Sequence, residues 1–579
     1  MTLLDRVGSP EAVRALPASE LPALAHALRE EIIAVCGRVG GHLGASLGAV
    51  ELVVALHRVF HSPHDRLVFD VGHQAYAHKL LTGRRERFAT LRQEGGLAPF
   101  LDPAESPHDA FGAGHACTAV SVALGLAEGL ARSGGLHRAV AVVGDGGLTG
   151  GLTFEGLNNA GASRLPLVVV LNDNGMSISS NVGAVERLLR SADARAFFES
   201  LGFTYLGPLD GHSFAELLPA LAEARRSRRP VVVHARTEKG RGFLPAESDA
   251  RTRGHAMGPY EWRDGKLVRS RGGQRTFSEA FAEALERALE ADGRVVVVTP
   301  AMLEGSALTG LQARFPGRVH DVGIAEQHAL AFAAGLARGG LRPVCAIYST
   351  FLQRALDQLV HDVVLPGLPV TLGIDRAGLV GADGATHQGA YDLAFLRPLP
   401  GLRLYAPVVG ADVEPMLATA LTGAGPAALR FPRGTLPDPG PPLPPSRVPV
   451  DGARWLLEPA APRACIVALG PLALAALEAA HGREDVAVLD ARVLSPLDDA
   501  AVDRACDTGA VLTVEEGTTH GGLGSAVLER AARTGRKLRA RLLGLPDAFV
   551  RHGDARAQRA ALGLAPPGIA RALDELLGR

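Results

Sequence analysis

The sequence is poor in cysteine, and its cysteines form no recognisable pattern. Cys36, Cys117, Cys345, Cys465 and Cys506 are scattered over 579 residues, and no two of them have C-x-x-C spacing. The sequence therefore predicts neither a disulfide framework nor a thiolate zinc site, and it favours a reducing compartment.

The sequence also lacks a long apolar run and an excess of charge of either sign. Its first twenty residues carry charges throughout, and no uninterrupted apolar stretch is long enough to span a bilayer. With 60 basic against 61 acidic residues, no global field would attract nucleic acid or an anionic membrane. We therefore expect a cytoplasmic enzyme that acts on small molecules, with no nucleic-acid or membrane partner.

Glycine and proline are abundant, with 69 and 38 residues, and they separate Val/Ile/Leu-rich runs from Ala/Leu-rich helical stretches. Near-continuous apolar strands that alternate with helices are typical of parallel sheets covered on both faces. The pattern recurs three times, which predicts an α/β fold with three domains, and a polar passage at 248–275 marks the first boundary. The predicted parts are 1–250, 275–435, a proline-rich linker at 436–450, and 451–579. The predicted strands lie within 66–72, 137–147, 165–174, 229–237, 294–302, 318–327, 341–350, 368–378, 462–470, 485–493 and 509–517.

Two predicted strands of the first domain end in polar residues, at Asp145 and Asn174. One crossover helix fits between them, so the two side chains can lie side by side at the carboxyl edge of a sheet. With a backbone carbonyl they would give Mg²⁺ part of an oxygen shell that phosphate oxygens and water complete. Gly144, Gly146 and Gly147 would let the backbone approach a phosphate. A tight turn and a helix cap are the alternatives that need no ligand.

This pair resembles the thiamine diphosphate motif, in which Asp145, Asn174 and the carbonyl of Met176 would hold magnesium. The resemblance then extends over nearly the full length of the chain to the 1-deoxy-D-xylulose 5-phosphate synthase family. The segments that carry it are 70–85, 171–179, 207–212, 298–306, 321–329, 346–358, 375–392 and 429–434.

The resemblance implies a transketolase-like transferase that uses thiamine diphosphate and Mg²⁺. Pyruvate would lose carbon dioxide, and its two-carbon remainder, carried as a carbanion or enamine on the cofactor, would join D-glyceraldehyde 3-phosphate. The product, 1-deoxy-D-xylulose 5-phosphate, begins non-mevalonate isoprenoid biosynthesis and also serves thiamine biosynthesis. The family further implies a homodimer in which the first two domains of one subunit face each other.

Glu326 matches the carboxyl group that bonds the aminopyrimidine N1′ of the cofactor. A surface glutamate in the first turn of a helix is the alternative. Phe351 corresponds to the residue that stacks on the pyrimidine and Ile324 to one that packs near it, although either could be ordinary core. Further implied cofactor contacts are His73, Gly114, His115, Ala116, Gly146, Gly147, Lys239 and Phe243. Ala116 replaces a serine that is common in the family, so only its backbone can take part.

The substrate residues implied by the resemblance are hydrogen-bond donors and cations. His42, His73 and His387 could donate to substrate oxygens or move protons, and Asp383 would bind a hydroxyl of the acceptor. The resemblance implies a phosphate clamp, for which forked guanidinium donors are well suited. It consists of Arg376 and Arg433, with Tyr348 and Arg354 beside them. Structural histidines, a turn-forming aspartate and solvated surface arginines are the alternatives.

Two features depart from the family. Between 176–191 and 201–212 the family usually has a longer excursion over the active site, whereas this chain has only 192–200. Gly175 stands where the family often has glutamate.

Two other functions fit parts of the pattern. Transketolase shares the cofactor and the domain order, and a catalytically silent assembly subunit would share the fold. The presence of Asp145, Asn174 and Glu326 speaks against the silent subunit, because assembly requires none of them.

Overall fold

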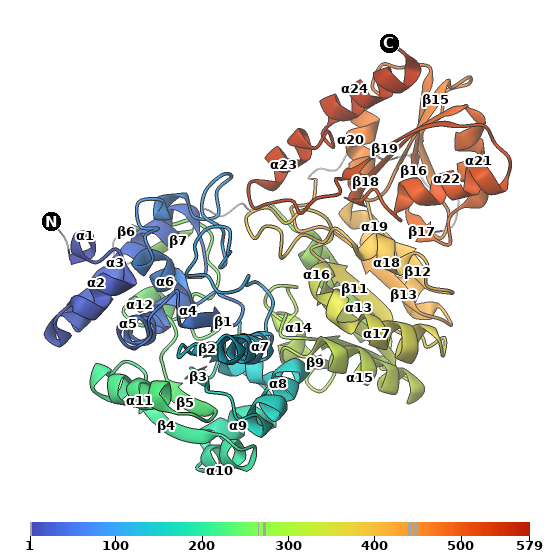
Figure 1. Cartoon of the computed structure of the whole chain (residues 1–579). Coiled ribbons are helices and arrows are strands. Elements are labelled where there is room, and N and C mark those ends of the chain that lie inside the picture. The colour runs from blue at the N-terminus through green and yellow to red at the C-terminus, as the bar shows by residue number, and fades with distance from the viewer. Residues whose placement is uncertain (1–2, 264–265, 270–273, 438–442, 444–449) are drawn as a thin grey trace. The chain divides into compact units, whose positions relative to one another are not determined.

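The computed structural model describes residues 3–263, 266–269, 274–437, 443 and 450–579. The chain forms two compact units. The first comprises Met1–Gly272 with Gly323–Ala325, and the second comprises Gly273–Val322 with Glu326–Arg579. Figure 1 labels the elements of both units.

The first unit is built on a parallel five-stranded sheet with the strand order β1-β2-β3-β5-β4. Its strands are β1 (Arg66–Phe69), β2 (Ala139–Gly144), β3 (Leu167–Asp173), β4 (Thr204–Asp210) and β5 (Val231–Arg236). Every residue of β3 is buried, as expected for a strand covered on both faces. The register pairs Gly144 with Asn172, so β2 and β3 end at the same edge of the sheet.

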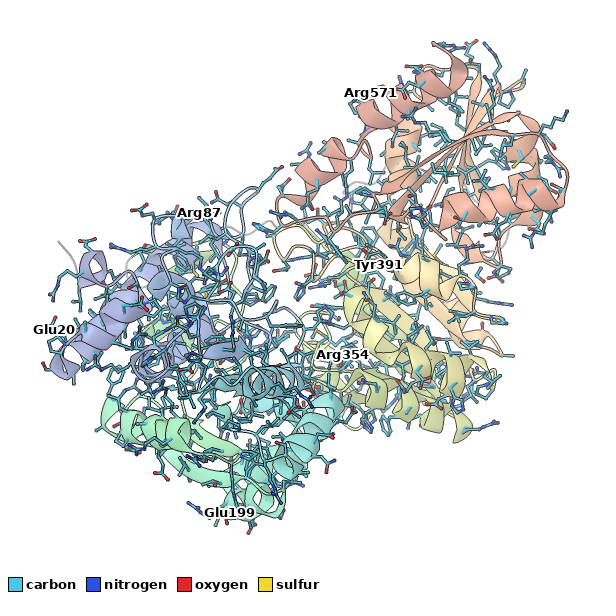
Figure 2. All side chains as sticks on the ribbon, in the orientation of Figure 1. Glu20, Arg87, Glu199, Arg354, Tyr391 and Arg571 are labelled. Carbon is cyan, nitrogen blue, oxygen red and sulfur yellow. The ribbon has the colours of Figure 1, made fainter. Side chains whose placement is uncertain are left out.

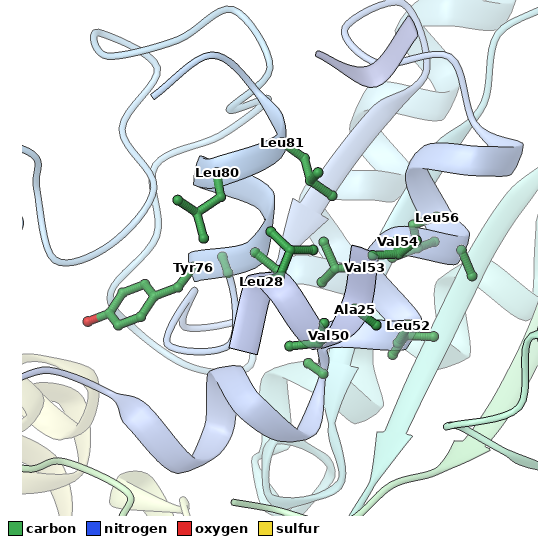
Figure 3. Close-up of a cluster of buried hydrophobic side chains, with 14 of the residues drawn as sticks. Ala25, Leu28, Val50, Leu52, Val53, Val54, Leu56, Tyr76, Leu80 and Leu81 are labelled. Atoms are coloured by element: carbon green, nitrogen blue, oxygen red, sulfur yellow. The ribbon is translucent and has the colours of Figure 1, made fainter. Parts of the chain in front are cut away.

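Helices cover both faces of this sheet, as the sequence predicts (Figure 1). Alternate strand residues pack on α3, α5, α6 and α11 on one face and on α7, α8 and α10 on the other. Figure 3 shows the first of these cores, from which Tyr76 extends so that its hydroxyl accepts the His42 N–H at 3.1 Å. The helices and the hairpin of the unit are α1 (Leu3–Arg6), α2 (Pro10–Ala15), α3 (Leu21–Val39), α4 (Leu43–Gly48), α5 (Val50–Val59), α6 (Tyr76–Leu81), α7 (Ala119–Arg132), α8 (Gly151–Ala162), α9 (Ala184–Arg190), α10 (Asp193–Ser200), α11 (Phe214–Arg226), α12 (Leu244–Glu247), β6 (Tyr260–Arg263) and β7 (Lys266–Arg269).

The second unit contains two sheets. The larger has the order β17-β12-β13-β11-β10-β8-β9 and is parallel except for β17. The smaller has the order β14-β16-β15-β18-β19 and is parallel except for β14. The strands are β8 (Val295–Thr299), β9 (Val319–Asp321), β10 (Arg342–Tyr348), β11 (Thr371–Asp375), β12 (Arg403–Tyr405), β13 (Ala427–Arg430), β14 (Arg454–Leu457), β15 (Ala464–Ala468), β16 (Val486–Asp490), β17 (Val493–Ser495), β18 (Ala510–Thr518) and β19 (Arg539–Leu545).

Helices again pack on both faces of the larger sheet. α15 packs on one face, and α13 and α19 pack on the other. The helices of the unit are α13 (Phe277–Ala291), α14 (Thr309–Arg314), α15 (Glu326–Arg338), α16 (Ser349–Leu352), α17 (Leu356–Gln358), α18 (Asp392–Leu396), α19 (Gly410–Thr422), α20 (Leu472–Ala479), α21 (Asp499–Asp507), α22 (Leu523–Arg533), α23 (Ala555–Ala561) and α24 (Pro566–Leu577).

Each predicted strand segment contains a strand of the structure, and the α/β fold class is confirmed. The first part of the polar passage, 248–263, packs on the first unit, because Gly41 and Met257 form a β-bridge and Tyr260 lies in the core of that unit. The predicted linker at 436–450 lies almost wholly outside the described residues. Among the helices that the structure describes, none is both long and apolar enough to cross a membrane.

Candidate active site

Asp145 and Asn174 lie at the carboxyl ends of the neighbouring strands β2 and β3. Asp145 opens a short turn at Asp145–Thr149, and its Oδ2 accepts hydrogen bonds from the Gly175 N–H at 2.6 Å and from Asn181 Nδ2 at 2.8 Å. The Met176 N–H donates to Asn174 Oδ1 at 3.0 Å. The predicted metal ligands therefore belong to two adjoining loops at one sheet edge, and Asn181 is an additional residue that the sequence did not single out.

The chemistry of this edge suits a divalent cation. Asp145 Oδ1 is buried and has no hydrogen-bond partner among the described residues. Burial, followed by the nearby charge of Asp173, raises the pKa of Asp145 well above its usual range. A buried carboxylate oxygen without a partner is costly, and a hard cation would satisfy it. The described residues include no group of three or more His, Cys, Asp or Glu side chains placed for a metal, so this site would combine carboxylate, amide and carbonyl oxygens.

The glycines after β2 allow close packing around this edge. A Cβ on Gly146 would lie 2.8 Å from Ser177 Cβ, and a Cβ on Gly147 would lie 2.7 Å from Asp70 Oδ2. Lys239 Nζ donates to the carbonyl of Ser177 at 2.7 Å, which ties the loop after β3 to the segment after β5. Burial lowers the pKa of Lys239 to about 7, with the charge of Asp145 opposing that shift.

Asp70 fixes the loop that carries Gly114, His115 and Ala116. Its carboxylate accepts the N–H groups of three consecutive residues, Cys117 at 2.9 Å, Thr118 at 3.1 Å and Ala119 at 3.2 Å. These N–H groups lie at the start of α7, where Thr118 is the N-cap and Ala119 the first helical residue, and a carboxylate is favourable there. Asp70 therefore fixes the loop that is predicted to contact the cofactor. The resemblance of the segment 70–85 to the family did not indicate this role.

Three histidines of the first unit form a cluster. Ring centroids are 6.2 Å apart for His42 and His73, 5.7 Å for His42 and His255, and 5.4 Å for His73 and His255. Burial lowers the pKa of His73 to about 3 and that of His255 well below its usual value, so both rings are neutral at pH 7. Sequence reasoning missed His255, because a single histidine in a passage rich in arginine and glycine gives no periodic signal.

Two predicted apolar contacts also belong to the first unit. Phe243 is buried, and its ring centroid lies 5.8 Å from that of Tyr260, so packing within the core accounts for its position. Ile324 belongs to the short piece Gly323–Ala325, and its N–H donates to Thr149 Oγ1 at 2.9 Å.

In the second unit Glu326 is the first residue of α15, yet it is only 2% exposed. Burial raises its pKa, and the positive charge of Arg354 opposes the shift, with Arg354 Nε 3.4 Å from Oε2. The surface-glutamate alternative is therefore wrong. Arg354, labelled in Figure 2, is an ion-pair partner of Glu326.

Phe351, Tyr348 and His387 form an aromatic group in the second unit. Phe351 stacks on Tyr348 with centroids 5.7 Å apart, and it meets His387 edge-on at 5.5 Å. The guanidinium of Arg376 lies 4.3 Å from the Tyr348 ring centroid, and its Nη1 bonds Asp375 Oδ2 at 2.7 Å. Arg376 is thus held tightly by its own neighbours.

Arg433 and Asp383 bond to each other, with Arg433 Nη1 2.6 Å from Asp383 Oδ2. The Arg433 side chain is 46% exposed, whereas that of Arg376 is 18% exposed. The structure therefore brings two predicted substrate residues together, and of the two clamp arginines Arg433 is the more accessible.

Known families match three parts of the chain. The 1-deoxy-D-xylulose-5-phosphate synthase family matches residues 4–196 and 191–237. The pyrimidine-binding domain of transketolase matches 274–439, and the C-terminal domain of transketolase matches 453–569.

Curated relatives match the chain from end to end. A 1-deoxy-D-xylulose-5-phosphate synthase of Myxococcus xanthus is 69% identical over 570 residues, which cover 98% of each chain. The synthase of Anaeromyxobacter sp. strain Fw109-5 is 49% identical over 627 residues, covering 100% of this chain and 98% of that one. Among solved structures, a transketolase of Campylobacter jejuni covers 97% of this chain and 100% of its own at 18% identity, with a TM-score of 0.46.

These matches also locate the short segment after α9. The 627-residue alignment is longer than this chain, and the family match breaks at 191–196, so the Anaeromyxobacter relative has residues that this chain lacks. The Myxococcus relative covers 98% of both chains and shares the short form. The short segment is therefore a natural variation.

Proposed function

Because the chain belongs to the 1-deoxy-D-xylulose-5-phosphate synthase family, we propose that it condenses pyruvate, with loss of carbon dioxide, with D-glyceraldehyde 3-phosphate to give 1-deoxy-D-xylulose 5-phosphate. The observation that supports this most directly is the buried Oδ1 of Asp145, which has no hydrogen-bond partner in the described part of the chain and lies beside Asn174 at the ends of β2 and β3. Oxygen donors of this kind suit a cation that carries a diphosphate.

The first unit would hold the charged end of the cofactor. Asp145, Asn174 and the Met176 carbonyl would bind Mg²⁺, and the backbone at Gly146 and Gly147 would approach the diphosphate. Thiamine diphosphate, with a divalent metal ion, is the cofactor of the family and supplies the electron sink for decarboxylation.

Glu326 would hold a proton at the aminopyrimidine N1′. Its burial supports this role, because a carboxyl group removed from water keeps its proton more readily and bonds strongly to a ring nitrogen. Phe351 would stack on the same ring.

The substrates would contact neutral hydrogen-bond donors and the accessible guanidinium of Arg433. His73 and His255 are neutral, so each can donate one N–H to a substrate oxygen without attracting a second proton. Arg433 and Asp383 would bind the phosphate and a hydroxyl of the acceptor. Because Arg376 already bonds Asp375, we propose that it orients Tyr348 as well as contributing charge.

The test is release of labelled carbon dioxide from pyruvate, with and without D-glyceraldehyde 3-phosphate. We expect release that depends on thiamine diphosphate and Mg²⁺, rises with the aldehyde and needs no lipoyl protein or oxidant. Activity with a ketose phosphate donor in place of pyruvate would indicate transketolase. Failure to bind thiamine diphosphate in a calorimetric titration would indicate a silent assembly subunit.

We also propose a homodimer in the cytoplasm. All five cysteines are buried and free, which suits a reducing compartment. Sedimentation analysis of the purified protein would test the dimer.

A further inference from the structure

Gly175 leaves a space beside the proposed metal site, and Arg190 fills it. Gly175 has φ +74°, and a Cβ built on it would collide with Nη2 of Arg190. The N–H of the same glycine bonds Asp145. The guanidinium therefore lies against the loop that carries the predicted metal ligands.

The position of Arg190 is fixed by the helix that carries it. Glu186, one turn earlier on α9, bonds Arg190 Nε. Leu189 is buried in the core of the first unit, and its carbonyl accepts from Arg236 Nη2 at 3.3 Å. The helix is thus anchored at its inner side, while the Arg190 side chain remains 64% exposed.

The charge of Arg190 acts on the metal site. Arg190 pairs with Glu186 and also interacts electrostatically with Asp173 and Asp145. A guanidinium near two carboxylates weakens their attraction for a bare cation, and it favours an anion that arrives together with the cation.

The chain differs from its family at this same place. The family match is split at 191–196, directly after the last residue of α9, and the chain has only the short segment 192–200 there. A guanidinium that pairs with Glu186 therefore lies at the place where the longer excursion is missing.

We propose that Arg190 is a further binding residue of this short form, which contacts the diphosphate of the cofactor on the solvent side of the metal site. The proposal rests on the metal and diphosphate site described above. In this role the positive charge of Arg190 offsets the negative charge of the diphosphate, and Arg190 does not serve mainly to stabilise α9.

The experiment measures the affinity of the protein without cofactor for Mn²⁺ alone and for pyrophosphate in saturating Mg²⁺. In Arg190→Ala we expect Mn²⁺ to bind about 3-fold more tightly and Mg²⁺-pyrophosphate about 10-fold more weakly, because the two ligands have opposite charges. Arg190→Lys, which keeps the charge without the fork, should recover part of the pyrophosphate affinity. The control is Arg187→Ala, an exposed arginine of the same helix, which should change neither affinity by more than about 2-fold.

Three results would contradict either the role of Arg190 or the metal and diphosphate site on which it rests. Unchanged pyrophosphate affinity in Arg190→Ala would overturn the proposal, and so would an equal loss of both affinities, which indicates a structural role. If the unsubstituted protein fails to bind Mg²⁺-pyrophosphate, the proposed metal and diphosphate site itself is wrong.

Discussion

At the scale of single residues, Glu326 is the group on which the proposed chemistry depends most. Glu326→Gln keeps the size and the hydrogen-bonding capacity of the side chain but removes its exchangeable carboxyl proton. We expect kcat for pyruvate decarboxylation to fall by about 10²- to 10⁴-fold, the usual worth of a positioned acid or base. The KM for pyruvate should change little, and initial-rate measurements separate the two constants.

The matched control is Glu414→Gln, an exposed glutamate of the same unit that pairs with Arg287. It should leave kcat unchanged. Full activity of Glu326→Gln would mean that the buried carboxyl group stabilises the fold around Arg354 and takes no part in catalysis.

Substitution of Arg433 should change the KM values of the two substrates to different extents. Arg433→Ala removes an accessible guanidinium, and we expect the KM for D-glyceraldehyde 3-phosphate to rise by about 10- to 100-fold, as for loss of a charge-assisted hydrogen bond. The KM for pyruvate should stay within about 2-fold, because pyruvate carries no phosphate. Steady-state kinetics with each substrate varied in turn provide the measurement, and equal losses for both substrates would refute the assignment.

The candidate metal ligands at strand ends could be predicted from the sequence, because parallel strands bring their carboxyl ends to one edge of the sheet. Asp145 and Asn174 each end an apolar run. Asp70 follows β1 at the same edge and obeys this rule, but the rule did not reveal its hydrogen bonds to the loop before α7, and His255 could not be found in this way. The role of Asp70 is revealed by three backbone hydrogen bonds and that of His255 by ring contacts, and both depend on how distant loops fold together.

At the scale of elements, a buried histidine pair joins α5 to α6. His57 Nε2 lies 2.9 Å from His78 Nδ1, and His78 Nε2 lies 3.1 Å from Asp109 Oδ1. Burial lowers the pKa of both histidines, and for His57 the neighbouring His78 adds to this effect. Arg84 bonds both oxygens of Asp109, which completes the cluster.

This cluster predicts that stability falls in mild acid. The folded-state pKa of each histidine lies below its unfolded value near 6.5, so the unfolded chain takes up protons first as the pH falls. The stabilisation is therefore present above about pH 6.5 and is lost below it, by at most about 1.4 kcal/mol per pH unit for each histidine. The melting temperature should drop between pH 7.5 and 5.5.

Substitution of His57 distinguishes the contribution of this cluster to the pH dependence of stability from that of the other titratable groups. His57→Gln should lower the melting temperature at pH 7.5, because it disturbs a buried contact, and should reduce the drop between pH 7.5 and 5.5. His26→Gln, at a histidine whose side chain is 77% exposed, should change neither quantity. The same pH dependence in His57→Gln and in the unsubstituted protein would show that the drop arises elsewhere.

Three of the strands that sequence reasoning did not foresee, β4, β17 and β19, lie at sheet edges. β4 and β19 are half exposed, so their residues show no continuous apolar run. β17 has only three residues and joins the larger sheet from beyond the proline-rich stretch. Central strands such as β3 and β8 are fully buried and were predicted, whereas β13, also central and fully buried, has only four residues and was not.

At the scale of the whole molecule, ligand binding couples to stability. A ligand that binds only the folded protein raises its stability by about 2.7 kcal/mol at a concentration one hundred times its Kd. Pyrophosphate and thiamine diphosphate share the charged end, whereas only the latter has an aminopyrimidine ring. Comparing the two ligands therefore separates the residues that bind the charged end from those that bind the ring.

The two ligands should respond differently to substitutions in the cofactor site. Mg²⁺ with thiamine diphosphate, and Mg²⁺ with pyrophosphate, should each raise the melting temperature of the unsubstituted protein. Asp145→Asn should abolish both increases, because both ligands need the metal. Phe351→Ala should reduce the increase for thiamine diphosphate, since stacking on an aromatic ring is lost, and should leave the increase for pyrophosphate intact. If Phe351→Ala left both increases unchanged, the aromatic group of the second unit would have no part in binding the cofactor, and the assignment of Phe351 to the aminopyrimidine would be withdrawn.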